Sequence, residues 1–319
     1  MRRLVTTSGR TAEATEESVA AGLADPGREG FWLDVEAPDE GDYRLLERVF
    51  GFHPLTIEDI QEVTERPKLD EYGSYLFLVV FTARLEGDDV HFMEQHLYAG
   101  KRFVVTVHHE PQPELDALRE RIRRGPELTR TDPGFLLYLV VDTLIDAMFP
   151  TLDRLDETID EIQDTVVERP SAQLLRRIYD LKHTVIDLRR QLGAQRDLVQ
   201  QLTSRLSQLH GREIGLYYRD VYDHVVRQYE TVDSLRDLLT GTVDVYLSTV
   251  SVRENATMKQ LTVVASLFLP LSFLTGFFGM NFAFLVDRIG SPWAFGIGVG
   301  LMGAITLVQL GIFRRRGLL

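Results

Sequence analysis

The chain has 319 residues, of which 44% are hydrophobic, and a formal net charge of −13 at pH 7. So acidic a surface excludes nucleic acid as a partner and would instead concentrate cations. The absence of cysteine excludes disulfides, thiolate metal sites and cysteine nucleophiles. No spacing typical of a catalytic triad, a phosphate-binding loop or a zinc site is present, so the sequence does not indicate an enzyme.

Residues 1–133 are predicted to form an α+β domain. Three segments rich in Val, Phe, Tyr and Leu alternate with turns and predict an antiparallel meander: Ser74–Leu85, Val90–Gly100 and Arg102–His109. A short helix is expected to start at Pro54. His108 and His109 are neighbours in a strand and point to opposite faces, so they do not predict a metal site.

Helical periodicity begins at Gly134. The break at Arg169-Pro170-Ser171 divides residues 134–210 into two predicted antiparallel helices. The acids between Asp153 and Asp164 repeat opposite an apolar stripe, which an amphipathic helix with a solvated polar face explains. After residue 210 no strong breaker occurs before Pro270. This predicts one helix of about 65 residues, roughly 100 Å long, whose first part is a stalk over residues 211–259.

The C-terminal part contains two runs without any charge, Gln260–Val286 and Ile289–Phe313. A helix needs ~20 mainly apolar residues to cross the hydrocarbon core, and both runs are long enough. We predict transmembrane helices over residues 260–279 and 293–313, joined by a loop over residues 280–292. A helical hairpin buried in a soluble protein is the alternative, but two runs of spanning length argue against it.

Basic residues flank the two predicted spans. Lys259 precedes the first span, and Arg314–Arg316 follow the second within a short tail, residues 314–319. Basic residues are typical of the cytoplasmic side of a membrane. The sequence therefore predicts a multi-pass protein of the cell membrane, with both termini and the acidic N-terminal part in the cytoplasm and the loop outside.

The first predicted span carries a stripe of small and polar residues. Its members recur every three or four positions: Asn255, Met258, Thr262, Ala265, Leu269, Ser272 and Gly276. Such a stripe either packs helices together in the membrane or lines a narrow path. Two helices enclose no pore, so conduction would require a symmetric ring of subunits. Pro270 removes one backbone hydrogen bond, which is tolerated where a neighbouring helix or water satisfies the freed carbonyl.

The stretch Met258–Phe282, "MKQLTVVASLFLPLSFLTGFFGMNF", resembles the CorA family of divalent-cation transporters. Gly279-Met280-Asn281 matches that family's signature triplet, and further similarity covers three segments: Phe50–Ile60, Val166–Lys182 and Arg219–Lys259. The resemblance implies a funnel-shaped homopentamer that imports Mg²⁺, and often Co²⁺ or Ni²⁺, and is gated by cytosolic Mg²⁺. It places the triplet at the pore entrance, where the amide of Asn281 receives the hydrated ion. Termination of the helix by Gly and Asn is the simpler interpretation of the triplet.

The sequence departs from the family pattern after the triplet. Many members carry acidic residues there, whereas "FAFLV" follows in this chain. A related branch of the same architecture transports Zn²⁺, and the intact triplet favours Mg²⁺ over it. Leu269 stands where the family often has Met, which keeps a constriction apolar and suits gating by dewetting. A membrane-anchored cytosolic sensor or scaffold without conduction is the alternative from another functional class.

The resemblance also implies a regulatory Mg²⁺ site between neighbouring subunits. Asp220 matches the stalk acid of that site, Asp223 lies close by, and Asp244 is a further candidate nearer the membrane. The resemblance implies that the partner acid comes from a turn between two strands of the next subunit. Three residues of this turn remain candidates for the partner acid: Glu86, Asp88 and Asp89. Carboxylates brought together repel each other, so a bound divalent cation would hold such an interface shut. Acids in exposed turns and helices are otherwise usually just solvated.

Overall fold

The computed structural model describes residues 1–24, 30–62, 66–125, 129, 133–210, 212–280 and 291–316. The chain divides into two compact units, Met1–Val243 and Asp244–Leu319. Helix α8 (Arg212–Phe278) contributes its first part to one unit and its last part to the other. The length of α8, 67 residues, is close to that of the long helix expected from the sequence.

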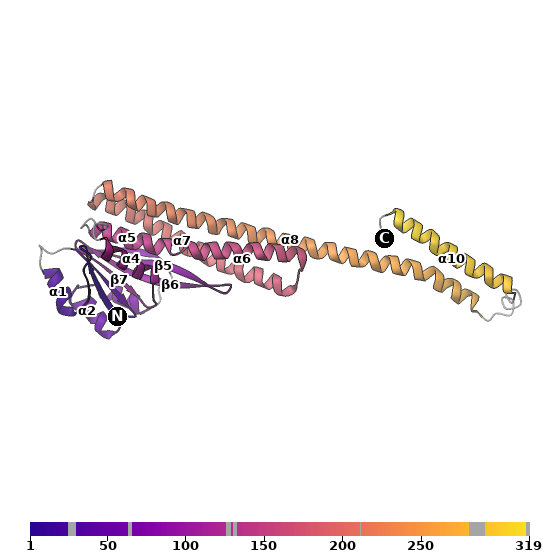
Figure 1. Ribbon diagram of the computed structural model, residues 1–319, viewed down its shortest axis with the longest axis horizontal. Coiled ribbons are helices and arrows are strands. Elements are labelled where there is room, and N and C mark those ends of the chain that lie inside the picture. The colour runs from indigo at the N-terminus through magenta and orange to yellow at the C-terminus, as the bar shows by residue number, and fades with distance from the viewer. Residues whose placement is uncertain are drawn as a thin grey trace. The chain divides into compact units, whose positions relative to one another are not determined.

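The first unit is built on a seven-stranded sheet with the strand order β2-β1-β3-β7-β6-β5-β4. Three of its strands, β5, β6 and β7, are labelled in Figure 1. The strands are β1 (Arg2–Thr6), β2 (Thr11–Glu13), β3 (Phe31–Glu36), β4 (Lys68–Tyr72), β5 (Tyr75–Glu86), β6 (Asp89–Gly100) and β7 (Phe103–His108). Strands β5, β6 and β7 form the predicted antiparallel meander. Strand β3 pairs with β7 in parallel, so the sheet is mixed. The sequence pattern did not predict the strands β1, β2, β3 and β4.

Each face of the sheet has its own hydrophobic core. Three helices cover one face: α1 (Glu16–Ala24), α2 (Glu40–Arg48) and α3 (Pro54–Gln61). Helix α3 starts at Pro54 as expected, and the ring of His53 accepts a hydrogen bond from the backbone nitrogen of Leu55 at 3.2 Å. On the same face Phe52 stacks on Tyr98 with 3.8 Å between ring centroids. These contacts fix the short helix against the sheet.

The longer helices cover the other face. They are α4 (Pro113–Arg124), α5 (Pro133–Asp146), α6 (Phe149–Glu168), α7 (Ala172–His210) and the first part of α8. The stretch Pro133–Glu168 is long and apolar enough to cross a membrane, but 61% of its most apolar window is buried within this unit. It is therefore a core segment. The apolar stripe of α6 is buried and the acids from Asp153 to Asp164 are exposed, which confirms the amphipathic interpretation.

A buried polar network joins β3, β7 and α4. Asp34 and His108 are each 1% exposed. Asp34 accepts hydrogen bonds from Thr106 Oγ1 at 2.6 Å and from His108 Nε2 at 3.1 Å, and it pairs with Arg119. His108 Nδ1 lies 2.6 Å from the carbonyl oxygen of Glu110. Because both ring nitrogens face acceptors, the geometry favours the doubly protonated imidazolium form of His108.

The charges of Asp34 and His108 stabilise each other. Burial lowers the pKa of His108, but the hydrogen bond and charge of Asp34 outweigh it, so this pKa lies above its usual 6.5. Burial raises the pKa of Asp34, but His108, Thr106 and Arg119 outweigh it, so this pKa lies below its usual 3.8. The histidine contribution is complete below pH 6.5 and is lost as the pH rises through the folded pKa. The aspartate contribution is complete above pH 3.8 and is lost as the pH falls.

Replacing His108 by glutamine is expected to lower the free energy of unfolding by roughly 3 kcal/mol at pH 6, because a buried charge pair loses one partner. The loss should shrink as the pH rises above 6.5 and through the raised pKa of the folded ring, because the wild type then loses the stabilisation that its imidazolium provides. Urea unfolding of the protein in detergent, at a series of pH values, measures the difference. The fluorescence of Trp32 is a local probe, since its Nε1 donates to Thr106 at 2.9 Å.

His109→Gln is the matched control for this measurement. His109 Nε2 lies 2.7 Å from the carbonyl oxygen of Ile60, on the opposite face of the sheet from Asp34. A glutamine amide can still donate to a carbonyl, so the control should cost little at any pH. An equal, pH-independent loss in both variants would contradict the imidazolium assignment for His108.

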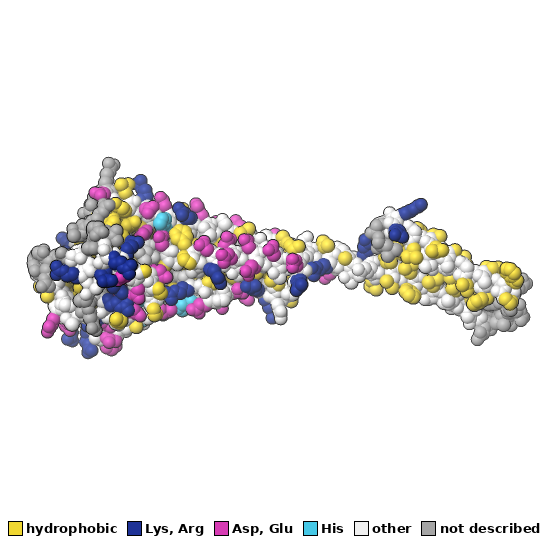
Figure 2. All heavy atoms as spheres, in the orientation of Figure 1, with side chains coloured by type: hydrophobic (Ala, Val, Ile, Leu, Met, Phe, Trp, Pro, Cys, Tyr) yellow, Lys and Arg dark blue, Asp and Glu magenta, His cyan; other side chains and the backbone are white. Residues whose placement is uncertain are grey.

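The second unit holds the last part of α8 and helix α10 (Pro292–Arg315), which run side by side (Figure 1). Both helices are long and apolar enough to cross a membrane, and only 6% and 0% of their most apolar windows are buried. Hydrophobic side chains gather on this unit in Figure 2. An α+β domain, a long helix and two apolar C-terminal helices confirm the predicted fold class.

Candidate functional site

The apolar last part of α8 has two different faces. The less exposed residues follow a spacing of three and four: Val263, Ser266, Leu267, Pro270, Leu271 and Leu274. This face turns toward α10, from which Gln309 Nε2 donates to the carbonyl oxygen of Ser266 at 3.1 Å. Every member of the predicted stripe, from Asn255 to Gly276, is exposed, and Leu269 is 73% exposed. Helical spacing therefore places the stripe on the side of α8 away from α10, unpacked within a single chain.

The signature triplet begins where α8 ends. The backbone nitrogen of Gly279 donates to the carbonyl oxygen of Thr275 at 3.0 Å, and that of Met280 donates to Phe277 at 3.3 Å. A Cβ atom at position 279 would lie 3.1 Å from the carbonyl oxygen of Thr275, so glycine permits this close approach. Asn281 lies outside the described residues, and its place at a pore entrance stays a prediction.

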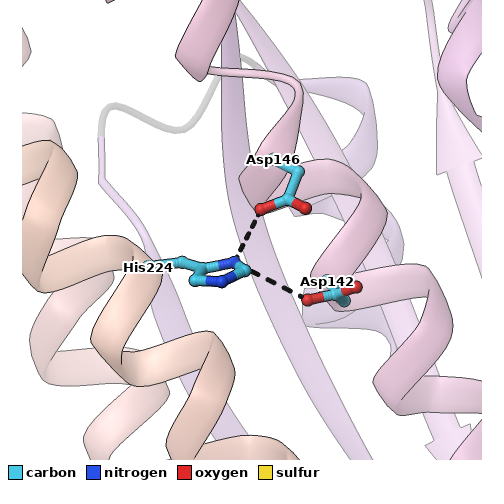
Figure 3. A group of neighbouring side chains, drawn as sticks. All are labelled: Asp142, Asp146 and His224. Atoms are coloured by element: carbon cyan, nitrogen blue, oxygen red, sulfur yellow. Dashed lines mark hydrogen bonds and ion pairs between the residues drawn. The ribbon is translucent and has the colours of Figure 1, made fainter.

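Two helices of the first unit bring three ionisable side chains together (Figure 3). Asp142 and Asp146 lie one turn apart on α5, and His224 approaches them from α8. One ligand atom from each residue lies within 4.8 Å of the others. His224 Nδ1 donates to Asp146 Oδ1 at 2.7 Å and lies 3.9 Å from Asp142 Oδ1. All three residues are half-buried.

The cluster carries excess negative charge. Burial raises the pKa of Asp142 to about 6; the charges of Asp146 and Asp220 add to this effect, and those of His224 and Arg121 oppose it. Asp142 Oδ1 has no hydrogen-bond partner among the described residues. Asp220 lies one turn before His224 on α8 and is exposed. Asp220, one of the acids predicted to be regulatory, is thus close enough to the cluster to raise the pKa of Asp142. The cluster itself includes none of the other predicted acids.

A cavity of about 380 Å³ opens beside the cluster. Residues of α4, α5 and the start of α6 line it, including Arg121, Asp142, Asp146 and Pro150. Mg²⁺ prefers oxygen ligands and usually keeps several of its waters, so two carboxylates beside such a cavity suit a partly hydrated ion. The ring of His224 holds Asp146 in place through its Nδ1 hydrogen bond. Because imidazole is a good ligand for transition metals, a site with two carboxylates and one histidine also suits Co²⁺, Ni²⁺ or Zn²⁺.

The other predicted regulatory acids do not join this cluster. Asp88 lies in the β5–β6 turn and forms an ion pair with Arg177 of α7, whose Nη2 donates to Asp88 Oδ1 at 2.8 Å. Hydrogen bonds from Arg177 lower the pKa of Asp88. The remaining four acids are all exposed: Glu86, Asp89, Asp223 and Asp244. Within one chain, Asp88 is therefore the most constrained of the three turn candidates.

The sequence pattern missed Asp142, Asp146 and His224. A usable signal was present, because Asp142 and Asp146 are the only charged residues in the apolar helix Pro133–Asp146 and lie four residues apart. An ionisable group inside an apolar helix is uncommon unless it has a partner. The partner itself could not be read from the pattern, since His224 lies 78 residues beyond Asp146 and meets it only through helix packing.

Comparison with known proteins gives consistent matches along the chain. A family described as CorA-like Mg²⁺ transporter protein matches residues 28–315. The chain is 32% identical over 291 residues to the cobalt/magnesium transport protein CorA of Thermotoga maritima, covering 89% of this chain and 82% of that protein. It is 25% identical over 292 residues to the protein of the same name from Methanocaldococcus jannaschii, covering 90% of each.

A solved structure shares the whole architecture. The complete structure of the CorA magnesium transporter from Methanocaldococcus jannaschii matches with a TM-score of 0.82 at 20% sequence identity. The match covers 100% of this chain and 99% of that one. At this identity the likeness concerns the fold, and it extends over both units.

Proposed function

The chain belongs to the CorA-like family of Mg²⁺ transporters, and from this premise we propose that it imports Mg²⁺ into the cytosol as a funnel-shaped homopentamer. In this proposal the exposed stripe of α8 lines the ion path, and the triplet Gly279, Met280 and Asn281 forms the pore entrance. Both termini face the cytoplasm. Co²⁺ and Ni²⁺ are further candidate ions, and the intact triplet favours Mg²⁺ over Zn²⁺.

The exposed stripe of α8 is the observation that carries this proposal. A single chain in a bilayer would present Ser272 to hydrocarbon, together with Thr262, whose hydroxyl donates to the carbonyl oxygen of Met258; the segment around them is otherwise apolar. A symmetric ring of copies would instead enclose them around a path that water can fill. The partner helix α10 lies against the other face of α8, so it leaves the stripe open to neighbouring copies.

Gating forms the second part of the proposal. Cytosolic Mg²⁺ binds at Asp142 and Asp146, with Asp220 adding negative charge and His224 positioning Asp146. The bound cation neutralises a site whose charges otherwise repel each other. Exposed Glu86 and Asp89 are left available to a neighbouring copy, and Asp223 and Asp244 are further candidates on α8. The closed state is the one with the ion bound.

Influx into vesicles tests the proposed transport. The purified protein, reconstituted in liposomes that contain a Mg²⁺-sensitive dye, should give influx on addition of external Mg²⁺. Asn281→Ala should lower the initial rate by at least about tenfold, the equivalent of ~1.4 kcal/mol. Thr306→Val is the control, because within the described part of the chain the hydroxyl of Thr306 bonds inside α10, to the carbonyl oxygen of Met302 at 2.9 Å. Absence of wild-type influx would favour a non-conducting sensor, and full activity of Asn281→Ala would remove that residue from the entrance.

A further inference from the structure

Pro270 leaves one carbonyl of α8 without a donor from its own helix. In an α-helix the backbone nitrogen of residue i donates to the carbonyl oxygen of residue i−4. Proline has no N–H group, so the carbonyl oxygen of Ser266 has no such donor. The helix nevertheless continues without interruption to Phe278. In a membrane an unsatisfied backbone group is costly, because no water is available to replace the missing bond.

A side chain of the second span supplies the missing donor. Gln309 Nε2 of α10 donates to the carbonyl oxygen of Ser266 at 3.1 Å. The hydroxyls of Thr262 and Thr275, which flank this point on α8, bond instead to the carbonyl oxygens of Met258 and Leu271. The donor to the orphaned carbonyl thus comes from α10, 43 residues further along the chain.

The amide of Gln309 is oriented by this one bond. Its other polar atom, Oε1, is buried and has no hydrogen-bond partner among the described residues. A buried polar group without a partner is unfavourable, so the unpaired Oε1 of Gln309 lowers the stability of the folded protein. The nitrogen side is the one with a partner, and that partner is the carbonyl orphaned by Pro270. This pairing is specific to one turn of α8.

We propose that Gln309 is a positioning residue that replaces the missing N–H of Pro270 and thereby fixes the proline turn of the first span against the second. Leu269 and Ser272 of the stripe flank this turn on the opposite face of α8. The bond therefore sets the orientation of the narrow part of the ion path. Its effect on transport rests on the proposed function, whereas its effect on the helix pair does not.

A double-mutant cycle tests the pairing. Gln309→Met keeps the length of the side chain and removes the donor, whereas Pro270→Ala restores the backbone donor to Ser266. In the wild type, Gln309→Met should shift the unfolding equilibrium toward the unfolded state by roughly 3-fold to 20-fold, the range measured for hydrogen bonds between membrane helices. In the Pro270→Ala background the same substitution should shift it by less than about twofold. Titration of the full-length protein with SDS in mixed micelles, followed by circular dichroism, measures both.

Thr306→Val is the matched control on α10, one turn before Gln309, and should give the same small shift in both backgrounds. Equal shifts for Gln309→Met in both backgrounds, or none in the wild type, would overturn the proposal. If Gln309→Met alone does not fold, the proposal requires that the double variant fold.

Influx measured on the same four proteins separates this inference from the proposed function. Gln309→Met should change the rate of Mg²⁺ influx, and Pro270→Ala should make the rate insensitive to that substitution. Coupling in the unfolding equilibrium without any wild-type influx would contradict the transport proposal and support the pairing of Gln309 with Ser266. Wild-type influx without such coupling would support transport and contradict the pairing.

Discussion

Replacing Asp142 by asparagine is expected to raise the cytosolic Mg²⁺ concentration that half-inhibits influx by at least about tenfold, as the loss of one group at a metal site does. The substitution keeps the shape of the side chain and removes one of the two carboxylates beside the cavity. It also removes the negative charge that faces His224. Patch-clamp recording from inside-out patches, with Mg²⁺ varied on the cytosolic side, measures the inhibition directly.

Folding and regulation can be separated in this variant. Burial and the charges of Asp146 and Asp220 raise the pKa of Asp142 to about 6, so its ionised form is disfavoured in the folded protein. A carboxyl group with a raised pKa destabilises the fold above that pH. Asp142→Asn should therefore unfold at the same temperature as the wild type, or higher, in Mg²⁺-free buffer at pH 7.5. Wild-type stability should exceed that of the variant only when Mg²⁺ is added.

Two further variants complete the gating experiment. Asp220→Ala should weaken inhibition in the same direction, because Asp220 contributes charge to the cluster. Asp153→Asn, on the exposed polar face of α6, is the matched control and should be inhibited like the wild type. Unaltered inhibition in both Asp142→Asn and Asp220→Ala would contradict the regulatory site. Equal loss of inhibition in the control would indicate a general effect of surface charge instead.

The parts of the fold that the sequence predicted depend on local patterns. The two apolar helices follow from the length of uncharged runs, and α8 follows from the absence of strong breakers before Pro270. The meander β5–β6–β7 follows from three adjacent strand patterns joined by short turns. These features need no knowledge of distant contacts, and helix length and hairpin pairing are the least context-dependent parts of a fold.

The parts that were missed depend on contacts between distant segments. Strand β3 lies beside β7 in parallel, and its residue Asp34 meets His108 only through that pairing. Asp142 and His224 meet only because α5 and α8 pack together. Asp34 and Asp142 each lie in a segment whose other residues are mainly apolar and buried. Burial of such a residue requires a partner, and no local pattern identifies that partner.

Replacing Leu269 by serine is expected to raise Mg²⁺ influx at inhibiting cytosolic Mg²⁺ by about tenfold or more, because a hydroxyl removes the apolar constriction that excludes water from the closed path. Leu269 is 73% exposed in a single chain, on the stripe that faces away from α10. In a symmetric ring each copy contributes one such side chain at the same level, so a single substitution changes the whole constriction. Dye-loaded vesicles with high internal Mg²⁺ measure the leak.

Leu307→Ser is the matched control for Leu269→Ser. Leu307 lies on α10 and is 71% exposed, so the two substitutions remove equal side chains of nearly equal exposure from the two spans. If α8 lines the path and α10 surrounds it, only Leu269→Ser opens the closed channel, while Leu307→Ser at most destabilises the protein in lipid. Leu269→Met preserves an apolar ring and should stay closed. A leak through Leu307→Ser, or no leak through Leu269→Ser, would contradict the assignment of the path lining to α8.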